Sequence, residues 1–221
     1  MRALNPPTMS NFSSSLVVLN EEGDIGAQSR VTQAGGMQEP VERWEALSDA
    51  ELVAVAATEP RAFAELYRRH VQRVYHFLLV HTPAPEDAAD LTQHVFLRAW
   101  ESLHYYQDRG IPFHAWLIRI ARNAATDMYR RSRVLTWDHL EEAFPITIGD
   151  PEAQTMRAEE LNQLRIAVGR LSREKQELLA LRFAAKLGAP EIAAITDRSV
   201  HAVRKQLERT IEELREQWHE D

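Results

Sequence analysis

The sequence contains no cysteine among its 221 residues. Disulfide bonds, zinc sites with thiolate ligands and cysteine nucleophiles are therefore excluded. Long hydrophobic runs are also missing, because the longest one near the N-terminus is Leu16 to Leu19. Such a run is far too short for the core of a signal peptide or for a membrane span. We therefore expect a cytoplasmic protein without membrane insertion.

Motifs of the common enzyme classes are missing as well. The sequence has no glycine-rich phosphate-binding loop, no G-x-S-x-G and no H-E-x-x-H. Its nine histidines are scattered. His76 and His81 are five residues apart and neither has an obvious carboxylate partner, so we interpret both as surface or core residues rather than metal ligands. The sequence predicts a protein that is not an enzyme and that needs no cofactor or metal.

The formal net charge of −7 hides an uneven distribution of charge along the chain. Residues 1–60 carry three basic and nine acidic side chains, and residues 134–160 carry one and seven. In contrast, residues 61–133 carry eleven basic and seven acidic side chains, and residues 109–133 hold six arginines against Asp127. Because local patches govern binding to a polyanion, the acidic total does not exclude a nucleic-acid partner.

The apolar residues from Ser48 onward have helical spacing, and no segment alternates as a strand does. Ser48 with Glu51 predicts a capping box, and Pro60 suits the first turn of a long helix. We therefore expect an all-α protein with two small helical domains joined by an acidic linker. The predicted boundaries are 1–43 for a flexible N-terminal extension, 44–133 for the first domain, 134–155 for the linker and 156–221 for a helix-turn-helix domain.

The stretch PEIAAITDRSVHAVRKQLERTIEEL has the spacing of a helix-turn-helix. Asp197 lies in the turn, where aspartate tolerates left-handed backbone angles better than most residues, and Ser199 is placed to cap the last helix. The expected buried stripe of this helix comprises Val200, Val203, Leu207, Ile211 and Leu214. His201, Lys205 and Glu208 then face away from the core. The second helix of such a motif commonly lies in the major groove, and a plain helical hairpin with a solvated charged face is the alternative.

Residues 116–131, WLIRIARNAATDMYRR, place two kinds of side chain on opposite faces of one helix. The apolar face comprises Trp116, Leu117, Ile120, Ala121, Ala124 and Met128. The polar face comprises Arg119, Arg122, Asn123, Asp127, Arg130 and Arg131. The preceding aromatic residues are Tyr105, Tyr106 and Phe113. Aromatic rings beside basic groups favour binding of unstacked single-stranded bases, whereas a merely solvated face is the alternative.

Two parts of the chain resemble a known family. DAADLTQHVFLRAWESLHYY with FHAWLIRIARNAATDMYRR resembles conserved region two of bacterial sigma factors, and LSREKQELLALRF with PEIAAITDRSVHAVRKQLERTIEELR resembles their region four. The resemblance covers residues 48–133 and 151–216. Because only a short acidic segment separates the two regions, the chain is similar to the extracytoplasmic-function group. It implies a factor that binds core RNA polymerase and promoter DNA, directs strand opening and initiation, and is controlled by an anti-sigma factor.

The resemblance also implies roles for matching positions. The helix with the D-x-x-Q-x-x-F pattern docks on polymerase in the family, which nominates Asp90, Leu91, Gln93, Phe96 and Arg98. The loop and basic helix after it bind the opened minus-ten element, which nominates Tyr105, Tyr106, Gln107, Arg109, Arg119, Arg122, Asn123, Asp127, Arg130 and Arg131. Region four binds the minus-thirty-five duplex, which nominates Arg198, Ser199, His201, Arg204, Lys205 and Arg209. Asp197 and Arg198 depart from the glycine and apolar residue that are usual in this turn.

A stand-alone DNA-binding regulator is an alternative from a different functional class. Such a protein needs only the C-terminal block, and the segment from Asp90 to Arg131 would then serve dimerisation or sensing. Transcription with core RNA polymerase separates the two interpretations, because a regulator binds promoter duplex by itself and does not direct initiation.

Overall fold

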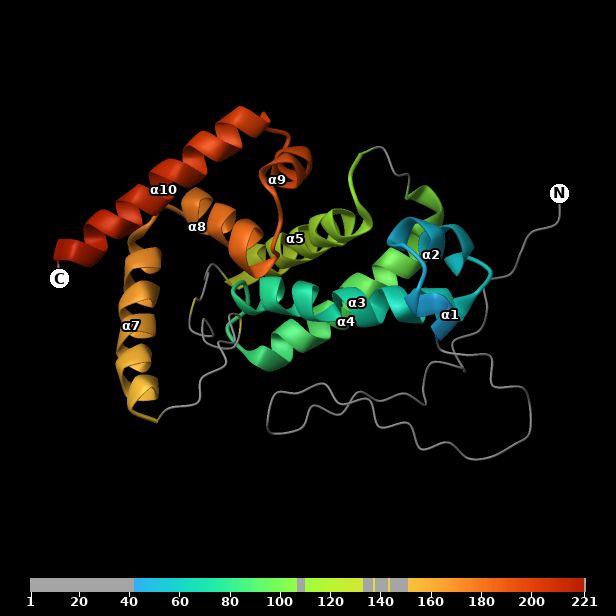
Figure 1. Cartoon of the computed structure of the whole chain (residues 1–221), viewed down its shortest axis with the longest axis horizontal. Coiled ribbons are helices and arrows are strands. Elements are labelled where there is room, and N and C mark those ends of the chain that lie inside the picture. Colours follow the sequence, from blue (N-terminus) through green and yellow to red (C-terminus); the bar gives the residue numbers. More distant parts are fainter. Residues whose placement is uncertain (1–41, 107–109, 133–136, 138–142, 144–150, 221) are drawn as a thin grey trace. The chain divides into compact units, whose positions relative to one another are not determined.

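The computed structural model describes residues 42–106, 110–132, 137, 143 and 151–220 (Figure 1). Every regular element among these residues is a helix. The N-terminal helices are α1 (Glu42–Glu45), α2 (Asp49–Ala56), α3 (Pro60–Leu79), α4 (Pro85–Ser102), the 3-10 turn η2 (Leu103–Tyr105) and α5 (Phe113–Ser132). The C-terminal helices are α7 (Pro151–Arg170), α8 (Arg173–Leu179), the π-helix η3 (Ala180–Ala184), α9 (Ala189–Thr196) and α10 (Val200–Glu220). The expected all-α class is confirmed.

The starts of α2 and α3 follow local sequence signals. The Ser48 backbone N–H donates to the Glu51 carboxylate over 2.7 Å, and the Glu51 backbone N–H donates to the Ser48 hydroxyl over 3.3 Å. This reciprocal pair satisfies two backbone donors that a helix start otherwise leaves open, as the capping-box pattern predicts. Pro60 occupies the first position of α3, where its missing N–H removes no helical hydrogen bond.

The core of the N-terminal helices forms where α3, α4 and α5 pack on one another. Phe77, Leu78 and Leu117 are fully buried there. At the other end of the same core, the Phe96 ring lies 4.7 Å from the Tyr67 ring and 6.4 Å from the Phe63 ring, measured between centroids in edge-to-face geometry. These contacts fix the orientation of α4 and α5, and thereby decide which of their side chains face outward.

A charged network joins α2 to α3. Asp49 accepts from His70 Nε2 over 2.7 Å and from Arg69 over 3.0 Å, while Arg69 also donates to Glu65 over 2.7 Å. The hydrogen bond from His70, helped by Arg69 and opposed by burial, lowers the pKa of Asp49 to about 2. The ionised carboxylate therefore stabilises the packing of α2 on α3.

We expect the Asp49→Asn substitution to lower the free energy of unfolding by about 1–2 kcal/mol at pH 7, after discounting for partial exposure of the carboxylate. Because the folded pKa lies below the usual value of 3.8, this contribution is complete above about pH 4 and is lost as the pH falls through 2. Urea unfolding of both proteins at pH 7, 4 and 2.5 checks this, and the difference must shrink at the lowest pH. A difference that is constant across this range would contradict the assignment.

The C-terminal helices contain the expected helix-turn-helix. Asp197 ends α9 in the left-handed conformation, with φ of 55° and ψ of 40°, and the Ser199 hydroxyl accepts from the Ala202 backbone N–H over 3.1 Å. Both predictions for this turn are confirmed. Helix α7 begins at Pro151, inside the range predicted as linker, and Ser172 precedes α8 without a side-chain capping bond.

Val203 and Leu207 of the predicted stripe on α10 are buried, together with Thr210. The sequence pattern missed Thr210, which lies on the same helical face and donates to the Gln206 carbonyl over 2.8 Å. That bond satisfies the hydroxyl inside the helix, which lets a polar residue occupy a core position.

Most of the predicted linker lies outside the described residues, but Trp137 is described and buried, with 6% of its surface exposed. Its indole N–H donates to the Gln176 side-chain oxygen over 3.3 Å, and the Gln176 amide donates to the Leu171 carbonyl over 2.9 Å. The linker is therefore attached to α8 at this ring.

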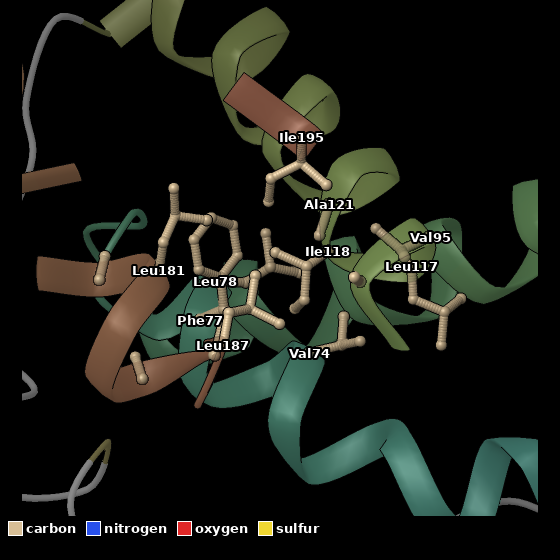
Figure 2. Packing of buried hydrophobic residues seen from close by; sticks show 14 of the residues in the cluster. Val74, Phe77, Leu78, Val95, Leu117, Ile118, Ala121, Leu181, Leu187 and Ile195 are labelled. Carbon is tan, nitrogen blue, oxygen red and sulfur yellow. The ribbon is translucent and has the colours of Figure 1, made fainter. Parts of the chain in front are cut away.

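The N-terminal and C-terminal helices contact each other and belong to one compact unit. Helix α5 packs on α9, and α3 packs on the π-helix Ala180–Ala184. Figure 2 shows the apolar residues at this interface, which are Phe77, Leu78, Ile118, Ala121, Leu181, Leu187 and Ile195. Residues far apart in sequence thus form one continuous hydrophobic core.

None of the helices in the described ranges is long and apolar enough to cross a membrane.

Candidate nucleic-acid and polymerase interface

The outward face of α5 displays the polar residues that the sequence pattern placed there. Arg119, Asn123 and Asp127 are exposed, whereas the Arg122 side chain is 36% exposed. The opposite face is anchored by buried residues, including Leu117 and Ala121. Arg130 and Arg131 lie on α5, but their side chains are outside the described residues. The buried stripe of α5 therefore holds a row of polar groups at the surface.

Of the rings of Tyr105, Tyr106 and Phe113, only that of Tyr105 is available for stacking. Tyr105 is 76% exposed and lies against His104, with ring centroids 3.8 Å apart. Phe113 is 2% exposed, and the Tyr106 hydroxyl donates to the Ile111 carbonyl over 3.0 Å while its ring contacts Phe113 edge to face. The expectation of a stacking surface on Phe113 was wrong, because this ring fills the core under the loop.

Gln107 and Arg109, the two remaining nominated residues of this loop, lie outside the described residues.

Helix α4 presents a second surface. Asp90, Gln93 and Arg98 are exposed, and Leu91 is partly buried. Leu97 is 41% exposed on this surface although the sequence pattern did not single it out. Residues spaced three, four and seven apart share one helical face, so Asp90, Gln93 and Leu97 lie together, and we call these three residues with Arg98 the α4 face. Leu97 adds one apolar side chain to an otherwise polar face.

Phe96, which was nominated with the α4 face, is 3% exposed. It points into the core between Phe63 and Tyr67 rather than to the surface. Phe96 therefore holds α4 on α3, and the α4 face does not include it.

Helix α10 presents a third surface. His201, Arg204, Lys205 and Arg209 are exposed along it, whereas Ser199 serves as the helix cap. Arg198 differs from them because it donates to the Glu174 carboxylate of α8 over 2.9 Å and also to the Gln206 side chain. These four exposed residues can donate to phosphates or base edges, and we call them the α10 face; Glu208 is exposed beside them.

Glu177 of α8 connects the two groups of helices. Its carboxylate accepts from His81 Nε2 over 2.8 Å and from Arg122 Nε over 3.0 Å. Burial alone raises the pKa of this carboxyl, but the hydrogen bonds and charges of His81 and Arg122 outweigh it and lower the pKa below its ordinary value. The sequence around His81 offers no obvious carboxylate partner, and the structure corrects the expectation that it has none: the partner lies 96 residues further along the chain.

A second contact crosses the same interface. His114 Nε2 of α5 lies 2.7 Å from the Glu191 carboxylate of α9. Burial, and then the nearby Arg73, lower the pKa of His114, which Glu191 opposes. Neither Glu177 nor Glu191 was nominated from the sequence, because each belongs to an ordinary amphipathic helix and its partner is remote. Within the described residues, no group of three or more histidines and carboxylates could hold a metal ion.

Comparison with known proteins gives a consistent result. Residues 66–134 match the sequence profile described as Sigma-70 region 2. The chain is 32% identical over 170 residues to the RNA polymerase sigma factor CnrH of Cupriavidus metallidurans, covering 71% of this chain and 86% of CnrH. It is also 32% identical over 158 residues to the ECF RNA polymerase sigma factor BldN of Streptomyces coelicolor, covering 70% of this chain and 60% of BldN.

Solved structures agree with these sequence matches. The structure of CnrH in complex with the cytosolic domain of CnrY superposes with a TM-score of 0.55 at 29% identity, covering 78% of this chain and 98% of the CnrH chain in that structure. The sigma factor RpoE from Bartonella quintana, solved with the anti-sigma factor NepR, shares the fold with a TM-score of 0.52 at 20% identity, covering 72% and 98%. Sequence, profile and fold together show that this chain belongs to the extracytoplasmic-function group of bacterial RNA polymerase sigma factors.

Proposed function

We propose that this chain binds core RNA polymerase, directs it to promoters and holds the opened DNA strand when transcription begins. The observation that carries the proposal is α5, whose buried stripe fixes Arg119 and Asn123 at the surface close in sequence to the exposed Tyr105 ring. Basic groups and an aromatic ring on one rigid helical module are suited to unstacked bases. In this proposal the chain is not an enzyme, since polymerase supplies the chemistry, and it works in the cytoplasm.

The three surfaces divide the work. The α4 face docks on core polymerase, and α5 with Tyr105 contacts the opened minus-ten strand. The α10 face lies in the major groove of the minus-thirty-five duplex, as the second helix of a helix-turn-helix commonly does. The proposed domains remain 44–133 for the first two tasks and 156–221 for the third, joined by the acidic segment 134–155.

A protein partner that controls this chain is part of the proposal. CnrH has been solved with the cytosolic domain of CnrY, and this chain covers 98% of that CnrH chain at 29% identity. An anti-sigma factor is the corresponding partner here. Its binding would cover one or more of the three surfaces and prevent their use.

The test is transcription in vitro with purified core RNA polymerase. Genomic DNA of the source organism is the template, and the 5′ ends of the transcripts are sequenced with and without this chain. We expect new start sites that share one upstream motif, and co-elution of the chain with core polymerase. A chain that binds promoter duplex tightly by itself but gives no new start sites with core polymerase is a stand-alone regulator instead.

A further inference from the structure

Arg198 connects three helices of the C-terminal group at one residue. Its backbone N–H donates to the Ala193 carbonyl of α9 over 3.1 Å. Its guanidinium donates through Nη1 to the Glu174 carboxylate of α8 over 2.9 Å and through Nη2 to the Gln206 side-chain oxygen of α10. Both terminal nitrogens of the guanidinium are therefore engaged inside the fold. We call Arg198, Glu174 and Gln206 the turn clamp.

The backbone of the turn places Arg198 between the two helices of the helix-turn-helix. Asp197 ends α9 in the left-handed conformation, so the chain changes direction immediately before Arg198. Ser199 caps α10 immediately after it. The side chain of Arg198 then reaches Gln206, eight residues further along the chain on α10. A residue that lies between two helices and also binds a third constrains the directions of all three.

Apolar packing alone does not set the direction of α10. Val203 and Leu207 are buried against the core, and hydrophobic contacts of this kind are non-directional. Side chains that read base edges must be held within about 0.5 Å and about 10–20° of their working positions. Hydrogen bonds weaken steeply when their angle changes, so the turn clamp supplies the directional constraint that the apolar stripe lacks.

A second polar contact ties the same turn of α8 to α10. Lys175, the neighbour of Glu174, donates to the Glu213 carboxylate. Glu213 follows Gln206 by seven residues, which places both on one side of α10, about 10 Å apart along its axis. Two contacts spaced along one helix fix its angle, whereas a single contact lets the helix pivot. The first turn of α8 therefore sets the angle at which α10 leaves the turn.

We propose that Arg198 is a positioning residue, which holds α10 through the turn clamp at the angle at which the α10 face reads the minus-thirty-five duplex, and that it does not itself bind the DNA. The inference rests on the proposed function for the task of the α10 face. It differs from the DNA contact that the family resemblance implies for Arg198. It also makes α8, which carries Glu174, part of the unit that recognises the duplex.

A direct contact between Arg198 and DNA predicts the opposite effect for Glu174. A carboxylate and a phosphate bind arginine through the same kind of charge-assisted hydrogen bond, so Glu174 would compete with the DNA backbone for a DNA-binding arginine. Removing Glu174 would then strengthen promoter binding. In the turn clamp Glu174 is needed, and its removal weakens specific binding. The sign of the effect of Glu174→Ala therefore separates the two roles.

The experiment uses the full chain assembled with core RNA polymerase. Its probes are two promoter fragments from the transcription experiment, one with the upstream element intact and one with that element scrambled. The ratio of the two affinities measures recognition by α10, and it cancels the sequence-independent attraction of any charge change. Arg198→Ala and Glu174→Ala should each lower this ratio about threefold to fivefold, the size expected for an exposed ion pair with one further hydrogen bond.

Matched variants separate positioning from phosphate binding and from loss of charge. Arg198→Lys should lower the ratio nearly as far as Arg198→Ala, because an ammonium cannot replace the planar fork, whereas a phosphate contact would tolerate lysine. Glu174→Arg combined with Arg198→Glu restores the ion pair and should return the ratio to within about twofold of the wild-type value. Glu216→Ala removes an exposed carboxylate of α10 and should leave the ratio unchanged.

Two further readouts distinguish the turn clamp from a base contact and from simple stability. Loss of the clamp should weaken discrimination at every base pair of the upstream element, whereas loss of one base contact affects one position. The melting temperatures of Arg198→Ala and Glu174→Ala should stay within about 4 °C of the wild type, because exposed ion pairs contribute little to stability. A loss of recognition that follows the fraction of unfolded chain overturns the positioning role.

Nitrogen relaxation of the arginine Nε–H groups tests the clamp in the free chain, without DNA. The guanidinium of Arg198 should be more ordered than that of the exposed Arg204, and Glu174→Ala should abolish the difference. An Arg198 side chain as mobile as Arg204, or tighter promoter binding by Glu174→Ala, overturns the inference. If Arg198 is ordered but the wild-type chain does not distinguish the intact from the scrambled element, the proposed task of the α10 face fails while the clamp stands.

Discussion

Alanine at both Arg119 and Arg122 is expected to reduce promoter opening by about a hundredfold. Hydrogen bonds to charged groups contribute about 1.5–3 kcal/mol each, and 1.4 kcal/mol corresponds to a factor of ten. The two residues are not equivalent. Arg119 is exposed, whereas Arg122 donates to the Glu177 carboxylate over 3.0 Å, so alanine at position 122 also removes an ion pair within the fold. Arg119→Ala alone is therefore the cleaner variant, with an expected tenfold effect.

Permanganate reactivity of unpaired thymines in the minus-ten element measures promoter opening directly. The salt dependence of binding to the opened strand gives a second readout. Each lost phosphate contact to a single strand reduces the steepness of log affinity against log salt concentration by about 0.7, so the double variant should reduce it by about 1.4. The control removes two exposed arginines outside the proposed surfaces, through Arg61→Ala with Arg215→Ala. Normal promoter opening by the variant with alanine at both Arg119 and Arg122 would contradict this role of α5. An equal loss of promoter opening in the control variant would contradict it as well.

Alanine at both Asp90 and Gln93 should weaken binding to core RNA polymerase at least about tenfold, as expected for central residues of a protein interface. Both side chains are exposed on α4 and no described contact of the fold uses them, so helix content and melting temperature should stay at wild-type values. Leu97→Ala should weaken binding in the same assay, because its exposed side chain adds apolar area to the same face. Titration of fluorescent chain with core polymerase gives the dissociation constants.

The control for the α4 face separates docking from folding. Phe96→Ala should destabilise the chain by about 3 kcal/mol, because a buried aromatic side chain is removed. Any loss of polymerase binding by the Phe96→Ala variant should therefore be accompanied by a lower melting temperature. Gln72→Ala with Glu212→Ala removes one amide and one carboxylate from exposed positions elsewhere and should leave binding unchanged. Wild-type affinity of the Asp90 and Gln93 variant would contradict the docking assignment.

The sequence predicted those parts of the fold that depend on near neighbours in the chain. Ser48 caps α2, Pro60 opens α3 and Asp197 takes the left-handed conformation, and in each case the residue's own chemistry decides the outcome within one helical turn. The polar face of α5 was predicted for a similar reason, since spacing alone separates it from the buried stripe.

The remaining features depend on packing between distant segments. The sequence shows that Phe113 is aromatic and lies close to a predicted loop. Only the packed structure shows that its ring faces the core. His81 and Glu177 meet because α3 and α8 pack together, and nothing local to either residue signals the other. The π-helix Ala180–Ala184 lies on this same packing surface, where η3 contacts α3. A pattern over one helix cannot report such tertiary pairings.

The buried ring of Trp137 attaches the chain to α8 soon after the end of α5. Only residues 133–136 separate Trp137 from the end of α5 at Ser132. An extended chain spans at most about 3.5 Å per residue, so this tether reaches about 18 Å. The bond between the indole and Gln176 therefore also bounds the distance between α8 and the end of α5.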